Sequence, residues 1–123
     1  EPILTRATQI FAGIAGAAGV ALAAAATHAG NPELLNPAAL VALTQAAALL
    51  LLSIRKPGLL RALAILCGVA GVVLFCGTMA TLAFLGWRLF TMSAPAGGIL
   101  LMLAWLMTGL AFAFGPRNGA GRE

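Results

Sequence analysis

Four apolar stretches, each close to the length of a bilayer crossing, make up most of this 123-residue chain. A hydrocarbon core of about 30 Å needs about 20 helical residues at about 1.5 Å of rise each. The sequence therefore predicts an all-α protein, a bundle of four transmembrane helices joined by short loops. The expected spans are Thr8–Ala29, Ala38–Ile54, Leu63–Leu85 and Ala94–Phe114.

The composition excludes a water-soluble bundle. Hydrophobic residues make up 62% of the chain and charged residues 8%, against about 25% charged residues in soluble domains. A soluble helix needs a polar stripe, yet Ile10–Ala26 and Leu63–Phe75 contain almost no residue to build one. Four crossings of about 20 residues leave no room for a second domain. We therefore expect a single integral membrane domain over residues 1–123.

Six of the seven basic residues fall on one side of the membrane in this arrangement. They are Arg6 near the N-terminus, Arg55, Lys56 and Arg61 in the second connection, and Arg117 and Arg122 near the C-terminus. The opposite side has only Arg88. The positive-inside rule then predicts a multi-pass protein of the bacterial inner membrane with both termini in the cytoplasm. Because the basic residues form no continuous stripe, no binding of nucleic acid is expected.

Residues 1–29 allow an alternative interpretation as a cleaved signal peptide, with Arg6 as its charged region. The apolar run is longer than the usual signal core of about 7 to 15 residues, which favours a spanning helix. A leader before Glu1 stays an open alternative.

Helix-breaking residues lie at both ends of the first connection: Asn31, Pro32, Asn36 and Pro37. Proline has no backbone N–H to donate a hydrogen bond, and it disfavours the helical conformation in the residue before it. The second helix is therefore expected to begin near Pro37 or Ala38. Its span of about 17 residues would be at the short end of the spanning range and would stand upright or lean on its neighbours.

Small residues recur on one face of the first predicted helix. Gly13, Ala17, Ala21, Ala24 and His28 follow one another at steps of three or four, which places them on one ridge. Small side chains let helices approach closely in lipid, so this ridge either packs inside the bundle or faces a partner chain. Further candidate helix-packing residues are Cys67, Gly71, Gly77, Gly97 and Gly98.

Polar residues in the outer half of the spans form a second candidate site. His28, Gln45, Thr78 and Thr81 could line a shallow polar pocket. Alternatively, Gln45 ties the second helix to the third by one hydrogen bond, and His28 is an ordinary histidine of the membrane surface. No charged residue lies inside a span, which argues against ion-coupled transport.

The sequence offers no candidate catalytic or metal site. Cys67 and Cys76 lie nine residues apart on one predicted helix, about 13 Å, which is too far for a disulfide. Both are expected to be packing residues. A single histidine makes neither a metal nor a haem site, and no nucleophile and base pair is present. We expect no metal, no cofactor and no enzymatic activity, although a membrane enzyme stays a third alternative.

Three motifs resemble those of the YgdD-like family, small four-helix membrane proteins of unknown function. They are the small-residue run Gly16–Leu22 that continues to His28, the segment Leu74–Thr78, and Pro95–Gly98 followed by Trp105. The resemblance covers roughly residues 13–106. The chain departs from the family pattern at Gln45, where the family tends to carry a second histidine, and at Ala23 and Ala25, where it carries Gly and Phe. The resemblance implies a fold and a location. It implies nothing about activity, because the activity of the family is itself unsettled.

Taken together, these features favour an accessory or structural subunit that packs on membrane lipids and on other membrane protein subunits or copies of itself. The alternative is a small transporter or lipid-binding protein that uses the outer polar pocket of His28, Gln45, Thr78 and Thr81.

Overall fold

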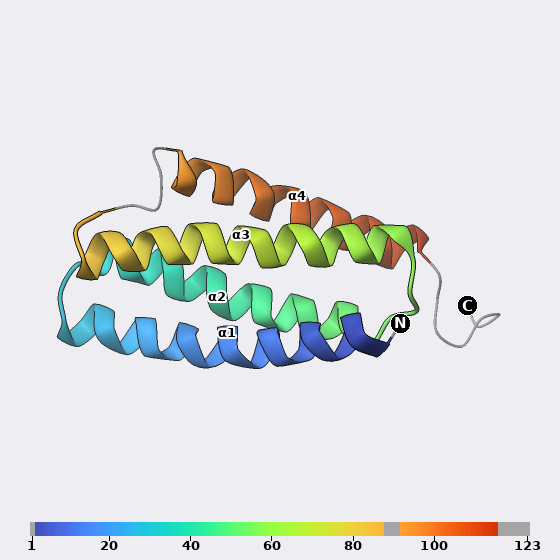
Figure 1. Ribbon diagram of the computed structural model, residues 1–123, viewed down its shortest axis with the longest axis horizontal. Coiled ribbons are helices and arrows are strands. Elements are labelled where there is room, and N and C mark those ends of the chain that lie inside the picture. Colours follow the sequence, from blue (N-terminus) through green and yellow to red (C-terminus); the bar gives the residue numbers. More distant parts are fainter. Residues whose placement is uncertain (1, 88–91, 116–123) are drawn as a thin grey trace.

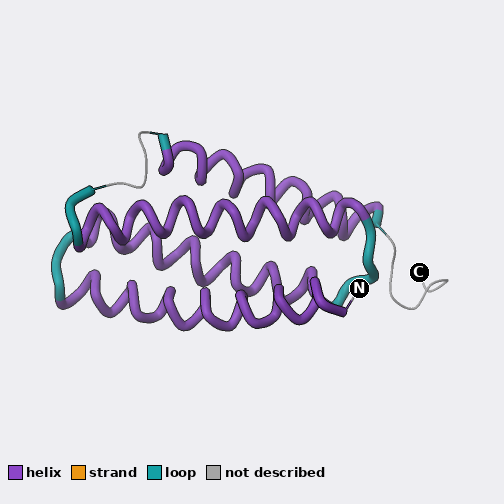
Figure 2. The backbone as a smooth tube through the Cα atoms, in the orientation of Figure 1, coloured by secondary structure: helices purple, strands orange, loops and turns teal. Residues whose placement is uncertain are grey.

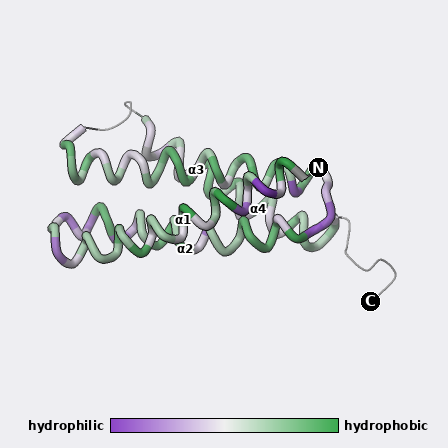
Figure 3. Tube along the Cα trace, turned by 60° about the horizontal axis from the view of Figure 1, so that its bottom comes forward, coloured by the Kyte–Doolittle hydropathy of each residue, from purple (hydrophilic) through white to green (hydrophobic). Residues whose placement is uncertain are grey.

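The computed structural model describes residues 2–87 and 92–115, and within these ranges the chain forms four helices and no strand. They are α1 (Pro2–His28), α2 (Pro32–Ser53), α3 (Leu59–Phe84) and α4 (Ser93–Phe114). Each is long and apolar enough to cross a membrane, and hydrophilic residues gather near the helix ends (Figure 3). The predicted all-α fold with four candidate membrane spans is confirmed.

The helices alternate in direction. The beginning of α1, the connection from α2 to α3 and the end of α4 lie at one end of the bundle (Figures 1 and 2). We name this the terminal end and the opposite one the distal end. Arg6, Arg55, Lys56 and Arg61 all belong to the terminal end, whereas Arg88, Arg117 and Arg122 lie outside the described residues.

The predicted start of the second helix is wrong by about a turn and a half. α2 begins at Pro32, directly after Asn31, which has a left-handed backbone (φ 57°), and Pro37 lies inside the helix. The backbone N–H groups of Leu34 and Leu35 donate to the Asn31 carbonyl, and the Leu35 side chain is completely buried. Proline is favourable in a first helical position, and burial of Leu35 outweighs the one hydrogen bond that Pro37 removes. With 22 residues, α2 is not a short span.

Close backbone contacts hold together two pairs of helices, the hairpin of α1 and α2 and the hairpin of α3 and α4. A Cβ atom on Gly97 of α4 would lie 2.6 Å from the backbone nitrogen of Phe75 on α3. A Cβ on Gly71 of α3 would lie 3.1 Å from the backbone nitrogen of Leu101 on α4. Gly19 of α1 approaches the backbone of α2 at Leu43 in the same manner. Because side chains would separate these backbones, the glycines make both hairpins tight.

The two hairpins meet fully only at the terminal end. One buried cluster there draws on all four helices: Ala12, Leu49, Leu52, Ala64, Ile65 and Ala111. The buried residues of the cluster toward the distal end belong to α2, α3 and α4: Ala38, Ala42, Val72, Cys76 and Leu101. Phe11 and Leu22 of α1 are partly buried against this cluster, while the close backbone contacts of α1 are mainly with α2.

Two arginines fasten the terminal end. Arg61 is buried; its Nε donates to the Leu52 carbonyl (2.8 Å) and its Nη2 to Oγ1 of Thr5 on α1 (2.9 Å). The Arg55 guanidinium lies 4.4 Å from the ring centroid of Phe112 and donates to carbonyls in the last turn of α4. Carbonyls at helix C-termini lack partners within the helix and favour cations. The two arginines therefore link the ends of all four helices.

Gly97→Ala should destabilise the α3–α4 contact, because the added Cβ meets the backbone of Phe75, which cannot rotate away. Overpacking of this kind costs about 1 to 3 kcal/mol, more than the gain of up to about 1 kcal/mol from the higher helix propensity of alanine. Gly98→Ala is the matched control, because no atom lies within 4 Å of a Cβ placed there. Thermal unfolding in detergent should give a lower midpoint for the first variant and an equal or higher one for the second. Equal midpoints for the two variants would contradict the close contact.

Candidate functional site

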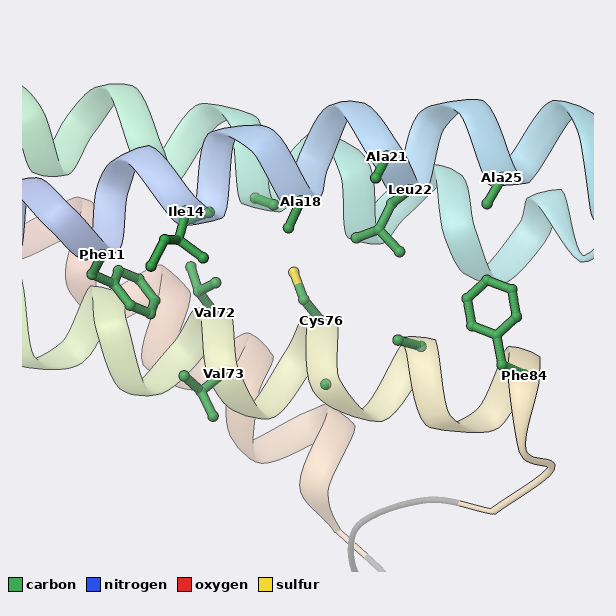
Figure 4. A pocket seen from close by; sticks show the side chains of 14 residues that line it. Phe11, Ile14, Ala18, Ala21, Leu22, Ala25, Val72, Val73, Cys76 and Phe84 are labelled. Atoms are coloured by element: carbon green, nitrogen blue, oxygen red, sulfur yellow. The ribbon is translucent and has the colours of Figure 1, made fainter.

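A groove runs along the bundle between α1 and α3, with α2 as its floor. Its walls are formed by α1 residues from Phe11 to Ala25 and by α3 residues from Val72 to Phe84, and Ala42 lies on the floor. The groove is open to the surface and has a volume of about 570 Å³. Phe11 and Phe84 lie at its two ends, and small side chains of α1 face α3 across it (Figure 4). α1 and α3 each pack on α2 along the groove, and Phe11 and Leu22 of α1 also contact the buried cluster that contains Val72 and Cys76 of α3.

The lining of the groove is apolar. All its side chains are aliphatic, aromatic or absent, with the exception of the Cys76 thiol. That thiol donates to the carbonyl of Ala38 on α2, with Sγ 3.3 Å from the oxygen. Apart from that thiol, the lining contains no group that could carry a proton or a charge, so the groove offers a ligand mainly shape and apolar contact.

The four residues predicted to share a polar pocket lie in separate places. His28 is exposed at the distal end of α1, and none of the four residues lines the groove. Gln45 is buried against α3, with Oε1 3.0 Å from the Cβ position of Gly68. Gly68 and Thr78 are ten residues apart on α3, about 15 Å along its axis. The geometry therefore does not assemble the predicted pocket.

The outer polar residues instead make local contacts. Thr78 is completely buried and donates to Oγ of Ser93 on α4 at 2.7 Å. Thr81 donates to the backbone carbonyl of Thr78 in its own helix. Gln45 forms no hydrogen bond to another described residue, so the predicted tie between the second and third helices is not observed. Thr78 thus serves the α3–α4 contact, and Thr81 bonds only within α3.

The candidate packing residues divide into two groups. Gly71 and Gly97 lie at tight contacts between α3 and α4. The ridge of α1 does not pack inside the chain, because Gly13, Ala17, Ala21 and Ala24 are all exposed. The face of α1 that contacts α2 carries a neighbouring set: Thr8, Ala12, Ala15, Gly19 and Ala26.

The remaining candidates lie outside tight contacts. Cys67 is half-buried and is not in a disulfide, and neither is Cys76. Gly77 lines the groove, and a Cβ on Gly98 would meet nothing.

Sequence reasoning missed most of the groove residues and predicted Ala21, Cys76 and Gly77 of its lining only as packing residues. Phe11, Ile14, Ala18 and Ala25 share one face of α1 at steps of three, four and seven. This face is next to the small-residue ridge and is equally apolar, so its pattern did not distinguish a groove wall from a lipid-facing surface. The groove also depends on the distance between α1 and α3. That distance is set by packing and cannot be predicted from the sequence of either helix alone.

The four apolar helices and the groove open to lipid define a small multi-pass membrane protein. Residues 10–98 match the family described as protein of unknown function DUF423, and the chain belongs to this family. No curated protein and no solved structure matches the chain. Among the described residues, no three His, Cys, Asp or Glu side chains are grouped so that they could hold a metal ion.

The hydrogen bond between Thr78 and Ser93 should be measurable as a coupling energy. Thr78→Val and Ser93→Ala should each lower the stability of the protein in detergent by about 0.6 to 1.7 kcal/mol, and the double variant should lose less than the sum because the two share one bond. Thr108→Val is the control, since its hydroxyl donates only to Ala104 of its own helix. Strictly additive losses in a double-mutant cycle would disprove the coupling.

Proposed function

We propose that this protein is a non-catalytic accessory or structural subunit that packs against larger membrane proteins and lipids, or against further copies of itself. The observation that carries the proposal is the exposed face of α1. Gly13, Ala17 and Ala24 lie there, and a Cβ placed on Gly13 would meet no described atom within 4 Å. In lipid, helices associate where small side chains let the backbones come close. This face of α1 is therefore suited to a helix from another chain.

The distribution of polar groups supports a role without catalysis. The charged side chains of the described residues belong to the helix ends and connections, away from the middle of each helix. Catalysis by proton transfer or nucleophilic attack needs a reactive group placed beside a substrate, and the groove offers only a hydrogen-bonded thiol. We therefore expect this chain to act on a partner through the shape and packing of its helices.

The proposal includes a location and a subfamily. The basic residues of the terminal end favour a bacterial inner membrane protein with both termini in the cytoplasm. The motif Pro95–Gly98 and the small-residue run before His28 favour a YgdD-like member of the DUF423 family.

The orientation can be tested by labelling from one side of the membrane. Lys56→Cys in the terminal connection should react with a membrane-impermeant maleimide only after the cells are permeabilised. His28→Cys at the distal end should react in intact cells, and the parent chain measures the background from Cys67 and Cys76. Labelling of Lys56→Cys in intact cells would reverse the proposed orientation.

The packing role predicts that bulk on the exposed face of α1 abolishes association. Ala17→Leu should lower the yield of co-purified partner about tenfold, which corresponds to about 1.4 kcal/mol of binding. Ala47→Leu is the matched control, because Ala47 is exposed on α2 on the face turned away from the core. The measurement is purification from native membranes in mild detergent, followed by cross-linking and mass spectrometry. A parent chain recovered only as a monomer without any partner would contradict the proposal.

A further inference from the structure

Positive charge is concentrated at the terminal end of the bundle. Among the described residues, this end has no acidic side chain and four basic ones: Arg6, Arg55, Lys56 and Arg61. By sequence, the same side of the four spans also has Arg117, Arg122, Glu1 and Glu123, and the opposite side has Arg88 and Glu33. The formal net charge of +4 therefore belongs to the terminal side alone, whichever of these groups pair with one another.

The terminal end lies at the level where a bilayer places its headgroups. Each of the four apolar helices begins or ends there, and hydrophilic residues gather at these ends (Figure 3). Basic residues beside a transmembrane helix attract anionic lipids, and each Lys or Arg contributes about a fivefold gain in affinity. The excess of positive charge therefore favours an anionic headgroup over a zwitterionic one.

The connection between α2 and α3 presents Lys56 on an anchored backbone. Before Lys56, the Arg55 side chain is held on the last turn of α4 by two backbone carbonyls and the Phe112 ring. After it, the Arg61 side chain donates to backbone carbonyls at the end of α2. The Lys56 side chain is exposed and forms no hydrogen bond or ion pair with another described residue. A group on a preorganised backbone loses less entropy when it binds a ligand.

Apolar side chains lie on both sides of this lysine in the connection. Ile54 is 63% exposed and Leu59 is 75% exposed. A ligand that matches this surface has an anionic group for the ammonium and hydrocarbon for the two flanking side chains. A phospholipid has both parts, whereas a soluble phosphate has only the first.

We propose that the connection between α2 and α3 binds the headgroup of an anionic phospholipid, with the Lys56 ammonium donating to the lipid phosphate. Lysine binds phosphate as a point charge, and Arg6 and Arg55 add to the positive potential at the same end. This inference deepens the part of the proposed function that concerns lipids. The site is at the terminal end and does not involve the exposed face of α1.

Native mass spectrometry of the full chain in mild detergent tests the proposal through the affinity for the first bound lipid. The parent should bind phosphatidylglycerol at least about fivefold more tightly than phosphatidylcholine. Lys56→Gln should weaken the binding of phosphatidylglycerol about fivefold, the contribution of one basic residue, and Lys56→Arg should keep the parent affinity. Because Lys56 is exposed, neither substitution removes a contact of the bundle. Higher ionic strength should weaken the binding, since salt screens exposed charges.

Asn36→Asp is the matched control, because it also lowers the net charge by one, but at an exposed position of the distal end. It should keep the parent affinity. Equal losses in Asn36→Asp and Lys56→Gln would show a response to net charge without a site. Equal binding of the two lipids by the parent would also overturn the proposal, and so would displacement of phosphatidylglycerol by excess inorganic phosphate. The assay uses the purified chain without a protein partner, so its failure is distinguishable from a failure of association through α1.

Discussion

In a bilayer, apolar side chains gain little by leaving the lipid, so helices associate through close backbone approach and a few polar contacts. The structure of this protein depends on that constraint. Gly71 and Gly97 bring α3 and α4 into backbone contact, and Gly19 does the same for α1 and α2. The buried bond from Thr78 to Ser93 adds a polar link inside the second hairpin. The molecule is accordingly built from two tight hairpins rather than from four equivalent helices.

The contact between the hairpins is uneven, and the proposed packing role follows from this unevenness. At the terminal end, a buried cluster from all four helices and the hydrogen bonds of Arg61 hold the hairpins together. Toward the distal end α1 packs mainly on α2, with Phe11 and Leu22 also against the cluster that contains Val72 and Cys76. An apolar groove lies between α1 and α3 there, and the small-residue face of α1 is exposed. That exposed face is the one proposed to contact a partner.

Several sequence predictions succeeded for a physical reason, and several failed for a related one. The number of helices was predictable because crossing a membrane is a property of each segment alone. The start of α2 was not, because the burial of Leu35 overrode the signal of Pro37. The outer polar pocket did not form because Gln45 and Thr78 lie at different depths, about 15 Å apart along α3. The basic residues Arg55 and Arg61 were read as topology signals alone, although they also cap helix ends.

By itself, the sequence determined the membrane environment, the helical class and the alternation of the four spans, because length and hydropathy decide these for each segment. The tertiary structure decided which face of each helix is covered. The helices are apolar on all sides, so no polar stripe marks the outside, and neighbouring faces such as those of Ala12, Ala17 and Ala18 look alike in sequence. They differ in the structure because the glycine contacts fix how each helix is rotated, and this rotation places Ala12 in the core, Ala17 on the exposed surface and Ala18 in the groove.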